Sequence, residues 1–488
     1  EITMIREKSK INNNNKGDVK VFINIGEHPY LARQGIDLLY KKIITLKEAL
    51  CGFSFDIQHL NKRIISFNNS TSNALIHPGY RKIVNDLGFK KENHLGNLII
   101  EFDVEFPENL SEEQITFQNS VRSLAERHLS KDSLQRAHDP LFPKDVAKLF
   151  AKNGLMGITL HEKDGGQGGK LMDAVLAIEQ VALVCPRSAD VIQSGSFGPL
   201  RTFAEYATEF QKEKYLSQLL NGEIVIGLGM TEPNAGSAVT DLTTKAVEDG
   251  EGFRVSGSKV FTSNSPDADI FLIYVRYHEG VNGIGSVLMD TSMEGFSKGK
   301  SSKYTNGEEW CALYFDNVYV PKENVLLGPG GFKKQIAGFN AERIGNTARS
   351  LAVGEFAYNV AREYALTREQ FGRKICEFQG IQWKFSDMKI KIEAGRLLLY
   401  RAAINADTGF PSSKETSIAK AFCNKAGFDI CNEAMQVMGG TGYSQESLVE
   451  YCFRKSRGWQ IAGGSTEMMK NRIAEDIFER RFSQRPNK

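Results

Sequence analysis

Glu342 stands directly before Arg343 in a stretch of sequence that can support proton transfer. A carboxylate serves as a general base when its surroundings raise its pKa. From Ile344 onward, apolar residues recur at intervals of three and four, which predicts a helix with one buried face. Asn340 is placed to cap this helix, and the helix dipole would favour an acid in the first turn even without a function. Residues 339–346 alone therefore leave both interpretations open.

Two further strings carry hydroxyl groups and small residues that can approach a ligand closely. Residues 229–237 read Gly-Met-Thr-Glu-Pro-Asn-Ala-Gly-Ser, and residues 257–265 read Gly-Ser-Lys-Val-Phe-Thr-Ser-Asn-Ser. Each string alone is typical of a surface turn. Both lie among short runs of β-branched and aromatic residues, which predict a β segment. The runs are at 244–247, 253–256, 270–275 and 313–318.

The C-terminal third adds three strings between apolar, helix-patterned segments. Residues 368–373 read Arg-Glu-Gln-Phe-Gly-Arg, residues 378–380 read Phe-Gln-Gly, and residues 436–443 read Gln-Val-Met-Gly-Gly-Thr-Gly-Tyr. Taken singly, these residues are surface polar positions and helix caps. An arginine can also meet two phosphate oxygens at once, which makes Arg368 a candidate nucleotide ligand.

Together and in this order, the five strings resemble the signatures of the acyl-CoA dehydrogenase family over about residues 112–484. The resemblance implies a multidomain α+β protein. Its parts are a helical domain at 115–225, a β-barrel-like middle domain at 226–330 and a C-terminal four-helix bundle at 331–488. It also implies FAD as cofactor, an acyl-CoA substrate, electron-transferring flavoprotein as partner, and a homotetramer or dimer.

The family resemblance assigns roles around the flavin. It implies that the Thr231 hydroxyl bonds the pyrimidine side of the ring, that Phe261 covers the isoalloxazine, and that Ser263 bonds near flavin N5. Ser237 would lie near bound CoA. Phe261 replaces the family's usual tryptophan, which keeps a flat apolar cover and loses the indole donor. Ala238 stands where the family commonly has aspartate.

The C-terminal strings resemble those that touch the pyrophosphate and adenosine of FAD across a subunit interface. Arg368 suits the pyrophosphate because its guanidinium presents two donors side by side. The same match carries over Phe371, Gln379, Gln436 and Gly440. Ser465 and Glu467 match positions near the flavin, and Glu467 is not the expected base.

The resemblance also selects between two positions for the base. Many family members carry it in a Tyr-Glu-Gly-Thr string, whose glutamate position is Gly463 here. A minority, including isovaleryl-type and long-chain-type enzymes, place glutamate directly before an arginine in the helix after the β domain. Glu342-Arg343 has that arrangement. Glu342 would then remove the proton α to the thioester carbonyl, with the β hydrogen passing as hydride to flavin N5.

The remaining residues of the implied site serve the substrate. The backbone amide of Gly463 would help to hold the enolate-like oxygen. Arg343 would shape the CoA end of the pocket, and Asn340 would add polar contacts there. Two alternatives keep this site and change the flow of electrons, to oxygen in an acyl-CoA oxidase or in reverse in an enoyl-CoA reductase.

The first hundred or so residues follow a different pattern. Four asparagines at 12–15 predict a disordered tail over 1–16. Apolar and acidic residues alternate over 98–106, which predicts a strand with one solvated face. Glycine and proline at turn-like positions extend this to a small, mostly antiparallel β domain over 17–114.

Short strings in this segment resemble the C-terminal substrate-binding region of DnaJ-type co-chaperones. The strings are at 27–29, 37–40, 46–52, 77–79 and 96–104. The family's His-Pro-Asp motif and its cysteine-rich zinc repeats are absent from the sequence. The segment is therefore either a partial β module joined to an enzyme or a groove that binds peptides by β-augmentation, in a co-chaperone fragment whose C-terminal half is not catalytic.

Composition excludes several classes of protein. A net charge of +2 gives no reason to expect nucleic acid, and no apolar run of about eighteen residues predicts a membrane span. The seven cysteines are scattered and never spaced as C-x-x-C, so we expect no zinc site, no other metal and no disulfide framework. Reduced thiols predict the cytoplasm of a bacterium or the mitochondrial matrix of a eukaryote. The N-terminus shows no signal-peptide pattern.

Overall fold

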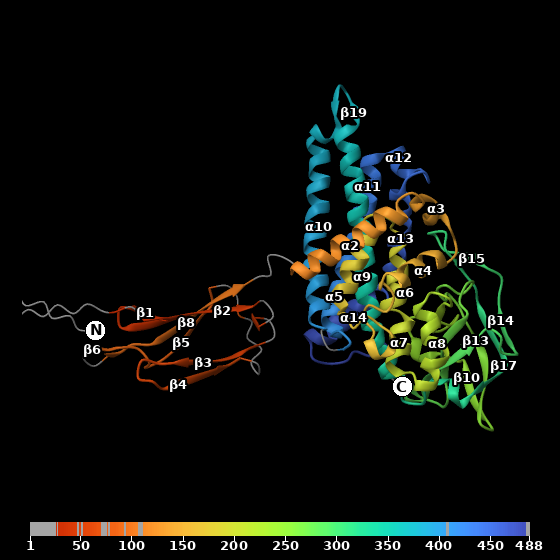
Figure 1. Ribbon diagram of the computed structural model, residues 1–488, viewed down its shortest axis with the longest axis horizontal. Coiled ribbons are helices and arrows are strands. Elements are labelled where there is room, and N and C mark those ends of the chain that lie inside the picture. The colour runs from red at the N-terminus through yellow and green to blue at the C-terminus, as the bar shows by residue number, and fades with distance from the viewer. Residues whose placement is uncertain are drawn as a thin grey trace, which may run out of the picture. The chain divides into compact units, whose positions relative to one another are not determined.

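The protein, seen here in a computed structural model, forms two units that divide between Ser111 and Glu112 (Figure 1). The structure describes residues 26, 28–45, 48–49, 52–69, 76, 79–91, 94–105, 111–406 and 409–484. Each unit has a hydrophobic core of its own. The tail predicted at 1–16 lies outside the described residues.

The first unit is built on a four-stranded sheet of order β1-β2-β8-β5. Its strands are β1 (Leu31–Gln34), β2 (Asp37–Thr45), β5 (Arg81–Val84) and β8 (Leu98–Glu105). The sheet is mixed, because β2 and β8 run parallel, but the other described pairings of this unit are antiparallel, so the module is mostly antiparallel as predicted. Parallel neighbours need a long crossover. The chain between β2 and β8 forms this crossover and contains two hairpins. One pairs β3 (Ser54–Gln58) with β4 (Ile64–Asn68), and the other pairs β6 (Lys90–Lys91) with β7 (His94–Leu95).

The second unit begins with seven α-helices. They are α2 (Glu112–Leu129), α3 (Ser133–His138), α4 (Lys144–Lys152), α5 (Leu171–Ala182), α6 (Ala189–Ser196), α7 (Pro199–Tyr206) and α8 (Glu209–Leu220). Helices α7 and α8 are separate, because Ala207 is extended and Thr208 starts a new helix. The Thr208 hydroxyl accepts from the Gln211 backbone while the Gln211 side chain accepts from the Thr208 N–H, which is a capping box.

An eight-stranded sheet follows, with the order β14-β17-β11-β10-β12-β13-β18 and with β9 paired to β12. Its strands are β9 (Ile226–Gly229), β10 (Lys245–Asp249), β11 (Gly252–Lys259), β12 (Ile270–Arg276), β13 (Ile284–Asp290), β14 (Phe296–Lys298), β17 (Leu313–Pro321) and β18 (Val325–Leu327). The described pairings form an open path, whereas the sequence predicted a barrel-like domain. Strand β12 is buried from Ile270 to Val275, because β9, β10 and β13 flank it.

The C-terminal part is a helical bundle with three long helices lying alongside one another (Figure 1). The long helices are α9 (Phe332–Thr367), α10 (Gln379–Ile404) and α11 (Ser413–Met438), and the short ones are α12 (Gly440–Tyr443), α13 (Leu448–Trp459) and α14 (Thr466–Ile477). None of the helices in the described part of the chain combines the length and apolar character needed to cross a bilayer.

The start of α9 corrects one prediction. The helix begins at Phe332, directly after a Gly-Pro-Gly-Gly turn, and Gly331 is its N-cap. Asn340 is therefore buried in the helix interior and does not cap it. Glu342 lies ten residues beyond Phe332, outside the first turn, where the dipole effect is concentrated. The helix dipole consequently does not account for a glutamate at this position.

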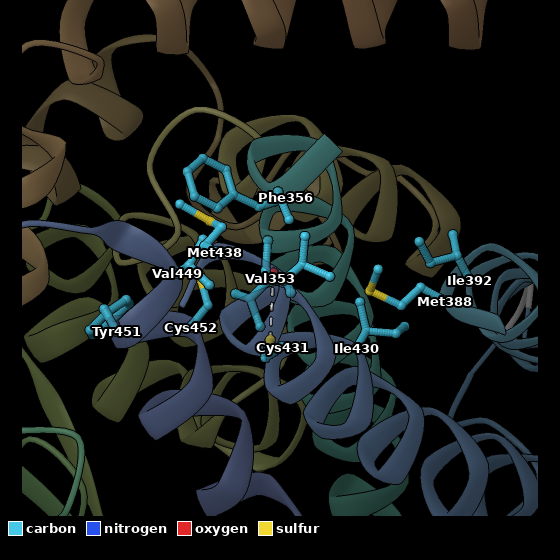
Figure 2. Close-up of a cluster of buried hydrophobic side chains, with 14 of the residues drawn as sticks. Val353, Phe356, Met388, Ile392, Ile430, Cys431, Met438, Val449, Tyr451 and Cys452 are labelled. Carbon is cyan, nitrogen blue, oxygen red and sulfur yellow. Dashed lines mark hydrogen bonds between the residues drawn. The ribbon is translucent and has the colours of Figure 1, made fainter. Parts of the chain in front are cut away.

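The bundle core holds α9 against α10, α11 and α13 (Figure 2). Val353 and Phe356 of α9 meet apolar side chains of the other three helices, and the Cys431 thiol donates to the Val353 carbonyl at 3.8 Å. Gly427 of α11 faces Ser350 of α9 so closely that a Cβ there would lie 2.3 Å from the Ser350 carbonyl oxygen. The two helices are thus in direct backbone contact, and their relative position is closely fixed.

Candidate active site

Glu342 sits on α9 in surroundings suited to a base. Part of its side chain is solvent-accessible. Burial raises the pKa of the carboxyl, and the charges of Arg349, Arg343 and Lys420 together with a hydrogen bond from Asn346 oppose that rise. The balance is a carboxyl that binds a proton more strongly than a free glutamate and is still surrounded by groups that favour its charged form.

Arg343 joins α9 to the loop that contains Gly463. Its Nε donates to the Gly463 carbonyl at 3.0 Å and its Nη1 donates to Asn340 Oδ1 at 2.9 Å. Burial lowers the pKa of Arg343 to about 10, against the opposing charge of Glu342. Gly463 has φ +69°, a backbone conformation that favours glycine. The structure thus brings together Glu342, Arg343, Asn340 and Gly463, which the sequence placed in two separate strings.

The β domain reaches the same place through β12. Tyr274 is fully buried, and its ring centroid lies 6.5 Å from that of Phe339 on α9. Burial, and then the charge of Glu342, raise the pKa of Tyr274. The carboxyl therefore lies between α9 and the sheet that carries the two hydroxyl-rich strings.

A buried ion pair fastens those two strings to each other. Lys259 Nζ donates to Glu232 Oε1 at 2.7 Å, and the same carboxylate accepts from the backbone N–H and hydroxyl groups of Thr243 and Thr244. Burial works against a charged Glu232, but Lys259 outweighs it and the pKa falls to about 2. Burial lowers the pKa of Lys259 to about 8. Sequence reasoning assigned neither residue a role; the available signal was one acid and one base in strings otherwise rich in hydroxyls.

The predicted flavin contacts lie beside this ion pair. The Val260 N–H donates to the Thr231 carbonyl at 2.9 Å, which places the second string next to Thr231. Phe261 is 57% exposed and has φ +55°, so the backbone holds an apolar ring in solvent in a sparsely populated conformation. Ser263 is exposed and Thr231 is half-buried. An exposed ring on a string that carries Ser263 and is bonded to Thr231 suits a flat cofactor with polar edges.

Trp310 of β16 (Glu309–Trp310) is a neighbour that sequence reasoning missed. Its ring centroid lies 4.6 Å from that of Phe261, and the Tyr304 ring stacks with it at a centroid distance of 5.9 Å. An indole therefore stands beside the phenylalanine that replaces the family's tryptophan. No local motif marks Trp310, because only the fold brings β16 next to the second string. Ser237, predicted near CoA, is exposed.

A second group of predicted cofactor residues gathers at the far end of the bundle, where α9 ends, α10 begins and α11 ends (Figure 1). The hairpin of β19 (Glu369–Gln370) and β20 (Arg373–Lys374) turns at Phe371-Gly372, both with positive φ, as in a type I′ turn. Phe371 is 95% exposed. The other members of the group, all exposed, are Arg368, Gln379, Gln436 and Gly440.

The two groups are far apart within one chain. Thr367 lies 25 residues beyond Glu342 on α9, which is about 38 Å at the α-helical rise of about 1.5 Å per residue. The residues predicted to contact the flavin lie near the first of these positions, and the residues predicted to contact the adenosine half lie beyond the second.

Ser465 and Glu467 stand where α14 begins, two and four residues after Gly463. The Ser465 hydroxyl caps the helix by accepting from the Met468 N–H at 3.4 Å. Glu467 is exposed, and its own backbone N–H and then Ser465 lower the pKa of its carboxyl. A carboxyl with a lowered pKa is a weak base, in contrast to Glu342. Within the described residues, no group of three or more acidic, histidine or cysteine side chains is arranged to hold a metal.

Comparison with known families assigns most of the chain. Residues 111–223 match the acyl-CoA dehydrogenase N-terminal domain, residues 227–318 the middle domain and residues 330–478 the C-terminal domain. Residues 2–107 match the DnaJ C terminal domain. The helix, sheet and bundle order of the second unit is thus that of a flavin-dependent dehydrogenase.

Individual relatives agree. A short-chain specific acyl-CoA dehydrogenase of Clostridium acetobutylicum is 32% identical, covering 76% of this chain and 99% of the relative. The caffeyl-CoA reductase-Etf complex subunit CarC of Acetobacterium woodii is also 32% identical over the same shares. The structure of butyryl-CoA dehydrogenase from Megasphaera elsdenii superposes with a TM-score of 0.71 at 31% identity, covering 76% of this chain and 99% of that one.

The chain belongs to the acyl-CoA dehydrogenase family. FAD is the cofactor of this family, and FAD-dependent dehydrogenation of an acyl-CoA thioester is the enzymatic activity that follows from membership. The alternative of a co-chaperone fragment with a non-catalytic half is not favoured, because all three dehydrogenase domains are matched.

Proposed function

We propose that Glu342 is the base that removes the α proton of the acyl-CoA thioester. The proposal is carried by one observation: a partly accessible carboxyl with a raised pKa directly precedes Arg343, whose guanidinium bonds the carbonyl of Gly463, the position where the family's other arrangement puts its glutamate. Gly463 has no side chain to perform the task, and Glu467 nearby has a lowered pKa. Glu342 is thus the carboxyl near this loop whose surroundings favour proton uptake.

The surroundings of Glu342 prepare it for this step. Burial excludes water and strengthens the base, while Arg343, Arg349 and Lys420 keep the carboxyl ionisable. The backbone N–H of Gly463 supports the thioester oxygen as negative charge develops on it. Asn340 and Arg343, bonded to each other, form the polar rim for the CoA end together with Ser237.

Thr231, Phe261 and Ser263 fit the flavin half of FAD, because two hydroxyl-bearing residues and an exposed ring lie on strings fastened by Glu232 and Lys259. When bound, FAD accepts the β hydrogen as hydride. The hydroxyls stabilise negative charge through hydrogen bonds, and Phe261 with Trp310 shields one side from water. Ser465 and Glu467 add contacts from the start of α14.

Glu342→Gln tests the assignment of the base. We expect the variant to retain FAD and to lose flavin reduction by acyl-CoA by about a hundredfold to ten-thousandfold, the usual contribution of a general base. Stopped-flow absorbance of the flavin under anaerobic conditions measures the rate. Glu363→Gln is the matched control, since Glu363 lies exposed on the same helix. Reduction at the unaltered rate in Glu342→Gln would refute the proposal.

We propose that the acyl group is short. Relatives named for short-chain and butyryl substrates align with this chain over nearly their whole length. A panel of acyl-CoA esters of increasing chain length, scored by anaerobic bleaching of the flavin, identifies it. Fastest bleaching by a long-chain ester would contradict a short acyl group.

Reduction of an enoyl-CoA is the second candidate, because a caffeyl-CoA reductase subunit is as similar as the dehydrogenases. Reoxidation of the reduced flavin by enoyl-CoA, faster than its reduction by acyl-CoA, would favour the reductase. Release of peroxide in air at the rate of turnover would instead identify an oxidase. Electron-transferring flavoprotein is the proposed partner for either anaerobic direction.

A homo-oligomer follows from the two separate cofactor groups. With about 38 Å of helix between them, the hairpin group of one copy is proposed to complete the flavin site of another. Helix α10 offers a surface for the contact: Trp383, Ile390 and Leu397 repeat every seven residues and are 60%, 65% and 69% exposed. A seven-residue apolar repeat forms one stripe along a helix, which suits packing against a second helix.

A further inference from the structure

Asn346 and Arg349 share a face of α9 with Glu342. They lie four and seven residues beyond it, so the three side chains follow one another along the helix. Arg349 Nη2 donates to Asn346 Oδ1, and Arg349 Nη1 donates to Asp190 Oδ1 of α6. Because the amide oxygen of Asn346 accepts from Arg349, the amide NH2 group points away from that arginine. From there it acts on the Glu342 carboxyl, whose pKa it lowers.

The same NH2 group occupies the space beside residue 463. A Cβ at Gly463 would lie 2.9 Å from Asn346 Nδ2, closer than carbon and nitrogen atoms approach without a shift. A side chain at 463 and the Asn346 amide therefore need the same volume. The Asn346 amide therefore connects two features of the site: the glutamate at position 342 of α9 and the absence of a side chain at position 463 of the loop.

A buried network keeps the amide in this orientation. Asp190 accepts from Arg187 and Lys455 as well as from Arg349. The Arg349 guanidinium also lies over the Trp459 ring, 5.1 Å from its centroid. Arg349 is thus held from α6 and α13 at once, and rotation of the Asn346 amide would break its bond to a buried guanidinium.

We propose that Asn346 is a positioning residue for the base: its amide, oriented by Arg349 and Asp190, holds the Glu342 carboxylate and fills the space that a side chain at 463 would need. The inference rests on the proposed role of Glu342 as base. It explains why this chain combines a glutamate on the helix with a glycine on the loop.

The charged and titratable groups that face Glu342 come from three elements. They are Arg343 and Arg349 on α9, Lys420 on α11 and Tyr274 on β12. Burial lowers the pKa of Lys420 to about 7, so this lysine titrates near neutral pH. Tyr274 stays neutral there, because burial raises its pKa. A test of Asn346 must therefore separate its effect from that of Lys420.

The first experiment titrates Glu342 directly by infrared difference spectroscopy of the full chain. The carboxyl band of Glu342 is the one missing in Glu342→Gln. Asn346 donates to the charged form, so its loss raises the pKa of the base. Asn346→Leu keeps the volume and removes the donor; we expect its titration midpoint to rise by about one pH unit, the size of a hydrogen bond to a charged group.

Two further variants keep this experiment decisive. Asn346→Asp still offers an acceptor to Arg349, so the fold is retained, but it cannot donate to Glu342 when charged and adds a negative charge; its midpoint must rise at least as far. Thr347→Val is the control, because the equally buried Thr347 hydroxyl bonds the Arg343 carbonyl instead. The rise must persist in a Lys420→Met background. An unchanged midpoint in Asn346→Asp overturns the proposal.

The second experiment tests the shared space. Gly463→Ala is strained by its positive φ in any background, but the clash with Asn346 exists only when the amide is present. We expect Gly463→Ala to lower the Tm of the full chain less in Asn346→Ala than in the unaltered protein. Equal losses overturn the claim of shared space.

The two levels of inference fail in different ways. Rapid flavin reduction by Glu342→Gln refutes the base and with it the proposed function. An inactive Glu342→Gln together with an unshifted midpoint in Asn346→Asp refutes only the positioning role.

Discussion

The two ends of α9 differ in how their polar side chains are supported. At the Glu342 end, charged groups from α6, α11 and α13 surround the helix, and Asp190 alone accepts from three cations. At the Thr367 end, the side chains predicted to bind the nucleotide are exposed, and Phe371 is held in solvent by a tight turn. At the Glu342 end, the polar side chains are held by partners from the same chain. The Thr367 end has the chemistry of a surface that another molecule completes.

The largest expected effect on stability lies at the buried end. Asp190→Asn removes the charge that compensates Arg187, Arg349 and Lys455, and a buried pair that loses one partner destabilises strongly. We expect the free energy of unfolding, from chemical denaturation, to fall by about 3–5 kcal/mol. Glu393→Gln, in an ion pair on the surface of α10 whose two side chains are each half exposed, is the control and should change it by less than about 1 kcal/mol. Similar losses in both would remove the contrast between buried and surface charges.

At the exposed end, Arg368→Ala should weaken FAD binding while leaving stability almost unchanged. Loss of a charge-assisted contact to phosphate corresponds to about a tenfold to hundredfold rise in Kd. Fluorescence titration of the deflavinated protein with FAD measures the affinity. Arg362→Ala, an exposed arginine near the end of the same helix, is the matched control. If both variants bind FAD equally, the hairpin end does not contact the nucleotide.

The apolar stripe on α10 sharpens the comparison further. Replacing Trp383, Ile390 and Leu397 together with glutamate should reduce the oligomer to smaller species in analytical ultracentrifugation, because charged residues interrupt helix packing. The folded content of each chain should change little, since all three side chains are more than half exposed. Replacing the exposed Lys389 with glutamate provides a control for added charge. An unaltered mass in the triple variant would place the subunit contact elsewhere.

The order of the motifs predicted the family and its activity, and the features that the sequence did not predict have physical causes. The family, its FAD and its activity followed from strings whose wording and order are specific. The start of α9 did not, because the Gly-Pro-Gly-Gly turn sets it and an asparagine that can cap a helix is also tolerated within one. The parallel pairing of β2 with β8 was missed because alternation predicts a strand and not its partner.

The buried network of ion pairs could not be predicted from the sequence for a related reason. Asp190, Glu308, Arg349 and Lys455 come from segments far apart in the sequence, and each alone has the composition of a surface residue. The same applies to Trp310, whose position beside Phe261 depends on the path of the sheet. Local patterns locate residues that act within one element, whereas long-range pairs require the fold.

The backbone contact between Gly427 and Ser350 fixes the separation of two helices that carry charged residues of the site. Where Gly427 meets Ser350, helices α9 and α11 approach without a side chain of α11 between them, so main-chain atoms of fixed size limit their separation there. Glu342 belongs to one of these helices and Lys420 to the other, so the same contact limits the distance between the base and this cation. Substituting Gly427 with alanine and then serine would move the two helices apart in small steps. Catalytic rate plotted against those steps would measure how much displacement the chemistry tolerates.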